Sequence, residues 1–369
     1  MRIEIYIENM SFIENVLAPP SYGWKSSDGL LVKPTARQLF AEFFRRINIT
    51  ASRKNWLPFF SWFSTLSLAP FFFIFIAMEI QDFNIWYLLV AFVYGMIFMG
   101  THGTIWYHRY GTHQAYTFSN KFWRFFTLNL VIKLVPEELY IVSHHVHHSL
   151  SDEPGDPYNA EAGFLYCFLA DANHQPIAKD LSEEDYKKAA AMLSHTGIKA
   201  NSYAGYLKWG SIAHPLNTVL ATFTNWAFWL TVFYLIGGPY LTVAILAGAF
   251  VWGLGVRTFN YEGHAKGETK HVTGFDYNTK DKSINQWWPG IVAGEWHNNH
   301  HLYPASARSG FLKRQIDFAW YYIWTLKLIG GISSCRDARK QFLETYRKPY
   351  LEEVKRMKTA TVKPATAIR

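Results

Sequence analysis

The sequence predicts an all-α membrane protein with four transmembrane helices in two hairpins and a helical cap on the cytoplasmic side. Half of the 369 residues are hydrophobic and 18% are aromatic, and the apolar residues gather in four long stretches. Lysine and arginine are absent between Lys54 and Arg109, and again between Lys208 and Arg257. Exclusion of charge from such long segments is typical of a chain that crosses a bilayer.

Each apolar stretch is long enough to cross the hydrocarbon core, which needs about 20 residues. The predicted spans are 56–78, 85–107, 215–236 and 240–259. The connectors 79–84 and 237–239 contain no basic residue, so the positive-inside rule places both away from the cytoplasm. We therefore expect a cytoplasmic arm over 1–53, an integral-membrane domain over 54–335, and a cytoplasmic helix with a basic tail over 336–369.

Other segments predict helices outside the spans. Residues 36–47 alternate apolar and basic positions at helical spacing, which fits a helix on the membrane surface or one packed on the protein equally well. Residues 122–142 are apolar but include Arg124 and Lys133, which are costly at the bilayer centre, so we expect an interfacial helix. Further helices are predicted over 182–193, 310–328 and 338–357, followed by a disordered tail of about a dozen residues.

The net charge of +8 would suggest nucleic acid in a soluble protein, but the sequence contains no nucleic-acid-binding motif. Anionic lipid or an acidic partner fits the charge better. The two cysteines, Cys167 and Cys335, provide neither a disulfide framework nor a zinc-binding spacing.

Histidines form the pattern from which a function can be inferred. The spacing H-x-x-H-H occurs at 144–148 and again at 297–301, and positions i, i+3 and i+4 share one face of a helix. His108 and His113 are five residues apart, about 140° out of phase on a continuous helix. This spacing predicts a break at Gly111. Asn260 and His264 form a further i, i+4 pair.

Because both hairpins close away from the cytoplasm, all these histidines are expected on one side of the membrane. The candidate metal ligands are His108, His113, His144, His147, His148, His264, His297, His300 and His301. Imidazole suits iron, zinc, copper and nickel, and nine imidazoles are too many for one ion and about right for two. His145 lies about 100° from His144 around a helix, so we expect it to point away.

Carboxylates near the histidines are candidates for a supporting role. A carboxylate that accepts the second ring N–H of a ligating histidine fixes its tautomer and offsets the charge of the metal. Asp152, Asp156 and Glu295 are close to the histidine motifs in sequence, so we expect them to act in this way.

The order H-x4-H, H-x-x-H-H, N-x3-H, H-x-x-H-H resembles the membrane-bound fatty acid desaturases, in particular the branch with the stearoyl-CoA and Δ9-type acyl desaturases. The phrases at 294–301 and 306–310, and the aspartates that follow the first H-x-x-H-H motif, are also similar to that family. The resemblance covers roughly residues 55–335. In that family nine histidines bind two irons, and an asparagine at the place of Asn260 contacts one iron through water.

The resemblance implies O2-dependent introduction of a cis double bond into a saturated acyl chain carried by CoA or by a lipid. It also implies an external electron donor: a ferredoxin, a rubredoxin or a cytochrome b5-type protein. A fused cytochrome b5-type domain would carry His-Pro-Gly-Gly, whereas this sequence reads His-Pro-Leu-Asn at 214–217. The acyl chain is expected in a tunnel between the spans, where glycines such as Gly95, Gly100, Gly253 and Gly255 either shape it or allow close helix packing.

Two departures from the family pattern occur beside the histidines. The second motif often has arginine where this sequence has His145. The third is usually preceded by Gly-Glu-Gly-Trp or Gly-Glu-Gly-Phe, whereas residues 293–296 read Ala-Gly-Glu-Trp. Neither change removes a candidate ligand.

Two other functions are compatible with the same residues. A di-iron lipid hydroxylase or acetylenase would share hydrogen abstraction and differ only in the fate of the radical. A non-enzymatic membrane metal-binding or transport protein would place its ligands within the spans. Here the histidine motifs lie at or beyond the cytoplasmic ends of the spans, which favours the enzyme.

Overall fold

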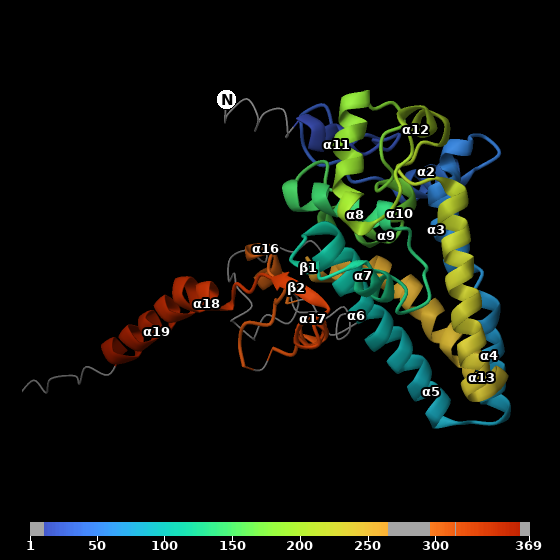
Figure 1. Cartoon of the computed structure of the whole chain (residues 1–369). Helices are drawn as coiled ribbons and strands as arrows, with labels where there is room; N and C mark the ends of the chain where they lie inside the picture. The colour runs from blue at the N-terminus through green and yellow to red at the C-terminus, as the bar shows by residue number, and fades with distance from the viewer. Residues whose placement is uncertain (1–10, 265–295, 314, 362–369) are drawn as a thin grey trace, which may run out of the picture.

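The structure, a computed structural model, describes residues 11–264, 296–313 and 315–361 (Figure 1). The described residues are mostly helical, as predicted, with one two-stranded antiparallel sheet that pairs β1 (Tyr116–Phe118) with β2 (Ile332–Cys335). Outside the candidate spans the helices are α2 (Ala36–Ile47), α7 (Lys121–Leu128), α8 (Glu137–Ser149), η4 (Ala160–Ala162), α9 (Phe164–Phe168), α10 (Ala170–Asn173), α11 (Glu183–Leu193), η5 (Ser194–Thr196), α12 (Tyr203–Trp209), α16 (His297–Leu302), α17 (Phe318–Leu328), α18 (Arg339–Phe342), η8 (Leu343–Arg347) and α19 (Lys348–Thr361).

Three helical stretches of the described chain are long and apolar enough to cross a membrane, and they contain all four predicted spans. Arg53–Gln81 comprises η1 (Arg53–Asn55), α3 (Trp56–Leu66) and α4 (Ala69–Gln81). Ile85–Thr112 comprises α5 (Ile85–Phe92), η2 (Val93–Met99), α6 (Gly100–His102) and η3 (Gly103–Thr112). Pro215–Gly263 comprises α13 (Pro215–Gly255), η6 (Val256–Thr258) and α14 (Phe259–Gly263).

The third stretch is broken where the sequence predicts a connector between two spans. Gly237 and Gly238 have non-helical backbone angles, and Gly238 has a φ of +67°, which glycine adopts without the steric penalty of other residues. The chain turns back at this point, so that the two parts of α13 run beside α4 and α5 (Figure 1). Phe233 before the break and Phe250 after it belong to one buried cluster.

Glycines allow these helices to approach closely. A Cβ atom at Gly95 would collide with the carbonyl of Gly248, and one at Gly248 would collide with the carbonyl of Ala91. At Gly253 a Cβ atom would lie 2.9 Å from the Thr65 side chain. Close helix packing, one of the two roles expected for the glycines, is therefore confirmed at Gly95 and Gly253.

The prediction of one interfacial helix over 122–142 is wrong beyond α7. Residues 129–136 follow no regular secondary structure, and α8 begins after Pro136. Side chains from the spans bond this irregular backbone: Tyr94 accepts from the Ile132 N–H at 3.0 Å, and Trp226 donates to the Lys133 carbonyl at 2.6 Å. Non-helical backbone at membrane depth is stable only where protein groups satisfy it in this way.

The other helical predictions are mostly confirmed. α2 has the predicted bounds, and it buries Leu39, Glu42 and Arg46, so one face packs on the protein while Phe40 and Phe44 remain exposed. α11 matches the predicted helix over 182–193. The helix predicted over 310–328 begins only at Phe318.

The C-terminal helical region extends from Arg339 to Thr361. The first residues of the predicted disordered tail are therefore helical, and the rest of that tail lies outside the described residues.

α8 lies between α11, which is outside the candidate spans, and η3 at the end of the second one. Val142 and Val146 on one face pack against α11 and against Val16 near the start of the described chain. The opposite face carries histidines and contacts η3. Packing on α11 thereby holds α8 against the end of the second candidate span.

Candidate metal centre

The structure brings all nine predicted histidines together in two adjoining groups. Within each group, one ring nitrogen from every member lies within 4.8 Å of those of the others. The five-histidine group consists of His108, His113, His144, His148 and His300, and the four-histidine group consists of His147, His264, His297 and His301.

His108 and His113 face the same group because η3 is a π-helix. The His113 N–H donates to the His108 carbonyl at 3.1 Å, the i to i+5 pattern of a π-helical turn. This pattern stacks residue i+5 near residue i, and the two ring centroids lie 5.0 Å apart. The predicted break at Gly111 is therefore wrong, because η3 continues to Thr112. Gly111 instead lets α8 approach, since a Cβ atom there would lie 2.7 Å from Ile141 Cδ1.

The two H-x-x-H-H helices divide their histidines between the groups in opposite ways. α8 contributes His144 and His148 to the five-histidine group and His147 to the other. α16 contributes His297 and His301 to the four-histidine group and His300 to the other. On a helix, residues i and i+4 lie nearly in line while i+3 is displaced to one side, so each motif bridges the two groups.

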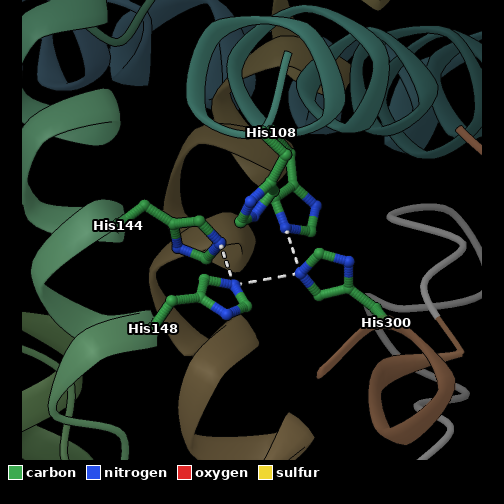
Figure 2. A group of neighbouring side chains, drawn as sticks. His108, His144, His148 and His300 are labelled. Carbon is green, nitrogen blue, oxygen red and sulfur yellow. Dashed lines mark hydrogen bonds between the residues drawn. The ribbon is translucent and has the colours of Figure 1, made fainter. Parts of the chain in front are cut away.

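In the five-histidine group the Nε2 atoms of His108, His144, His148 and His300 point toward one another (Figure 2). The Nε2 distances are 2.9 Å for His108 to His300, 3.0 Å for His300 to His148, and 3.2 Å for His148 to His144. A neutral imidazole nitrogen has either one hydrogen or one lone pair. His300 Nε2 and His148 Nε2 each lie close to two other ring nitrogens, so neither can form a hydrogen bond with both. A cation at the centre would satisfy all of them.

Aspartates fix the tautomers in the four-histidine group. His147 Nδ1 lies 2.9 and 3.0 Å from the two carboxylate oxygens of Asp156, and His264 Nδ1 lies 2.9 Å from Asp152. A carboxylate accepts the N–H, so the proton occupies Nδ1 and Nε2 keeps a free lone pair. His297 Nε2 lies 2.9 Å from the bare Nε2 of His264. The structure thus places Asp152 and Asp156 as predicted, while Glu295 lies outside the described residues.

The electrostatics of the two groups keep five of the imidazoles neutral. Burial, and then the neighbouring histidines, lower the pKa well below its ordinary value in each histidine of this set: His113, His144, His148, His300 and His301. Desolvation and like charges both disfavour the protonated ring. Unprotonated imidazole is the form that binds a metal, so at neutral pH the lone pairs are available.

Asn260 and His145 complete the list of predicted positions near the site. Asn260 Oδ1 is buried and has no hydrogen-bond partner among the described residues, an arrangement that calls for a water or an ion. His145 belongs to neither histidine group, in agreement with the expectation that it points away. Its Nε2 is buried without a partner in the described part of the chain.

A cavity of about 50 Å³ adjoins the five-histidine group between the second and third candidate spans. This volume is enough for several water-sized groups. The lining residues include His108, Val135, Tyr140, Trp252, Phe259 and Asn260. Gly100, one of the glycines singled out in the sequence, lines it as well.

Sequence reasoning missed the residues that hold the histidine-bearing elements in place. Arg109, directly after His108, is buried in an ion pair with Asp317, and Arg257 forms another with Asp171. Each arginine lies near the C-terminal end of an apolar stretch. The sequence signal was the basic residue at the end of a long apolar stretch, because a buried charge there requires an acidic partner.

Comparison with known proteins agrees with this geometry. The fatty acid desaturase family profile matches residues 83–322. The Delta-9 desaturase-like 2 protein of Arabidopsis thaliana is 29% identical over 244 residues, which cover 64% of this chain and 73% of that protein.

Two further relatives carry names that specify a substrate. The icosanoyl-CoA 5-desaturase of Limnanthes douglasii is 28% identical over 290 residues, 75% of this chain and 71% of the relative. Delta-9 acyl-lipid desaturase 1 of Arabidopsis thaliana is 27% identical over 272 residues, 71% of this chain and 76% of the relative. The family profile spans more than half of the chain, so this membrane protein belongs to the fatty acid desaturase family of oxidoreductases.

Proposed function

We propose that the chain is an O2-dependent fatty acyl desaturase that uses two iron ions to introduce a cis double bond into a saturated acyl chain. The observation that carries the proposal is the pair of adjoining groups of imidazoles, in each of which a ring nitrogen of every member lies within 4.8 Å of those of the others. Imidazole is a suitable ligand for iron, and nine ligands divide naturally between two ions.

The donor atoms of both groups fit two such ions. The five-histidine group would hold one, and the four-histidine group, with Asn260 through a water molecule, would hold the other. Bound iron supplies the redox chemistry with O2 that removes two hydrogens from neighbouring methylenes. Electrons come from a separate carrier of the ferredoxin, rubredoxin or cytochrome b5 type.

The protein's own part in the reaction is positioning. Asp156 and Asp152 hold the protons of His147 and His264 on Nδ1, which keeps Nε2 free. The apolar cavity walls, such as Val135 and Trp252, would hold one pair of methylenes beside His108 and exclude water. Alignment of the reacting carbon with the oxidising centre is the main source of rate and of double-bond position.

The acyl chain would run from a second cavity of about 300 Å³ on the other side of the 133–137 segment. That cavity combines apolar Leu57 and Leu128 with two lysines, Lys133 and Lys199, and two glutamates, Glu137 and Glu138. Its lining thus offers both an apolar wall and charged groups for the polar end of an acyl substrate. The names of the relatives include both an icosanoyl-CoA and an acyl-lipid desaturase. We propose a fatty acyl thioester of CoA or an acyl lipid as the substrate class.

For the topology we propose four spans in two hairpins, with the metal centre on the cytoplasmic side. The reversal at Gly237 and Gly238 supports division of the third stretch into two spans. The basic residues Lys54, Arg109, Lys208 and Arg257 then flank the spans on one side. The proposed division is a cytoplasmic arm over 1–53, the membrane domain over 54–335 and a cytoplasmic C-terminal region over 336–369.

Expression in a host with a defined set of saturated fatty acids tests the proposal. Gas chromatography–mass spectrometry of total lipids should detect a new monounsaturated acid that requires O2. The matched control is His301→Ala, which should insert in the membrane and yield no product. A hydroxylated or acetylenic product would contradict desaturation, and purified protein that binds zinc but no iron after anaerobic reconstitution would contradict the di-iron centre.

A further inference from the structure

A buried ion pair joins two of the elements that carry candidate ligands. Arg109 Nη2 lies 2.9 Å from Asp317 Oδ1, and the exposed fractions of the two side chains are 0% and 2%. Arg109 follows His108 on η3, whereas Asp317 precedes α17 and caps its first turn through the Trp320 N–H. The pair therefore links the end of the second candidate span to the segment that follows α16.

The arginine and the aspartate together fix residues 306–310, in the loop that follows α16. Arg109 donates to the Ala307 carbonyl at 2.7 Å and to the Ser309 hydroxyl at 2.8 Å. Asp317 Oδ2 accepts from the N–H groups of Ser309 and Gly310 at 2.8 and 3.0 Å. Charge-assisted hydrogen bonds of this kind are short and directional, so the loop has one position relative to η3.

The same loop holds α16. Asn299, which lies between the histidines of this helix, donates to the Ser309 carbonyl at 2.8 Å and to Gln315 Oε1 at 3.1 Å. A continuous set of hydrogen bonds thus runs from Arg109 through Ser309 to Asn299. It connects the element with His108 and His113 to the helix with His300.

Stability alone is a weak explanation for this arrangement. Replacement of a buried ion pair by apolar residues of similar volume is often neutral or stabilising, whereas removal of one partner alone is strongly destabilising. What a directional pair adds is a defined geometry between the two elements that it joins. The five-histidine group needs that geometry, because its ligands come from η3, α8 and α16, and α16 supplies only His300.

We infer that Arg109 and Asp317 are positioning residues that set the placement of His300 relative to His108 and His113, and thereby the affinity of the five-histidine group for its metal. This inference rests on the proposed two-metal centre. In Figure 1, α16 and α17 lie beside the end of the second candidate span, where such a link must act.

Three double variants test the inference. R109M/D317L removes both charges, so no unpaired buried charge remains. R109Q/D317N keeps two amides that can hydrogen-bond to each other. R46M/E42L is the matched control, because Arg46 and Glu42 form an equally buried pair at 2.6 Å on α2, far in sequence from either histidine group.

The measurements are the thermal unfolding midpoint in detergent, ferrous iron affinity by anaerobic competition with a chelator, and the Mössbauer spectrum. We expect wild type and R46M/E42L to bind two irons. Both Arg109/Asp317 variants should fold, with R109M/D317L unfolding at a lower temperature because the Ser309 and Gly310 N–H groups lose their acceptor. Both should keep one iron tightly and bind the second at least about tenfold more weakly. Their Mössbauer spectrum should then lose the signature of two coupled irons.

Two irons at wild-type affinity and an unchanged spectrum in the folded R109M/D317L and R109Q/D317N proteins would overturn the inference. Failure of both variants to fold while R46M/E42L folds would also overturn it, because the pair would then serve folding itself. Fewer than two irons in the wild type would instead refute the proposed function.

Discussion

The most direct test of the metal centre is removal of the charge on Asp156. This carboxylate is fully buried. Besides His147, it accepts from the N–H groups of Tyr158 and Asp152, both at 2.9 Å. Each of its oxygens accepts one of these two backbone N–H groups. In Asp156→Asn the amide NH2 must therefore face a donor.

The expected effect has two parts. One backbone hydrogen bond is lost, which lowers the free energy of unfolding by about 1 kcal/mol. An amide nitrogen turned toward His147 Nδ1 donates a hydrogen bond, so it favours the tautomer with the proton on Nε2. Nε2 is the proposed ligand atom and would then have no free lone pair. Loss of such a partner lowers metal affinity about 10–100-fold, which corresponds to about 1.4–2.7 kcal/mol.

Titration of the anaerobic apoprotein with ferrous iron against a chelator measures this affinity at both sites. Asp156→Asn should weaken the site of the four-histidine group and leave the other within a factor of a few. Glu153→Gln is the control, because Glu153 lies on the same loop and is exposed. Two irons at wild-type affinity in Asp156→Asn, with circular dichroism unchanged, would refute the tautomer argument.

Three further predictions concern other parts of the protein. His145→Ala should keep both irons while His148→Ala loses at least one, measured as iron per chain; equal loss would contradict the separation of His145 from the groups. Burial raises the pKa of Glu138 to about 7, although two backbone N–H groups oppose the shift. The folded protein therefore binds this proton more tightly than the unfolded chain does. The resulting stabilisation is complete below about pH 4.5 and is lost as the pH rises through 7. The free energy involved is about 3 kcal/mol, so Glu138→Gln should reduce the fall in unfolding temperature between pH 5 and pH 8, and an unchanged fall would contradict the shift. Val135→Phe should fill the cavity beside His108 and lower product at least tenfold, or move the double bond, with two irons retained; unchanged product by mass spectrometry would exclude this cavity as the acyl path.

The apolar helical stretches and the clustering of the nine histidines could be predicted from the sequence because each depends on a local pattern. Runs of apolar residues and H-x-x-H-H spacing need no knowledge of distant contacts. The geometry of His108 and His113 is not predictable in this way. A spacing of five residues fits either a broken α-helix or a π-helix, and contact between Gly111 and Ile141 on α8 belongs to tertiary packing.

The irregular segment over 129–136 shows the same limit. Its apolar residues resemble a helix when periodicity alone is considered. Its backbone is instead bonded by side chains such as Tyr94 and Trp226, which are far away in sequence. Similarly, no feature of the sequence pairs Arg109 with Asp317 or Arg257 with Asp171, since both partnerships exist only in the folded chain.

The division of histidines implies that the two proposed metal ions have unequal surroundings. α8 gives two ligands to one group and one to the other, and α16 does the reverse, so these helices alone would produce equal sites. The difference comes from the remaining elements: η3 adds His108 and His113 to one group, whereas α14 adds only His264 to the other. In the proposed centre Asn260, one helical turn before His264, would act through water in place of a fifth imidazole. Because an amide oxygen that acts through water binds a metal less tightly than imidazole does, the four-histidine site would exchange that ligand more readily. We therefore expect this ion to be the first to leave on chelation.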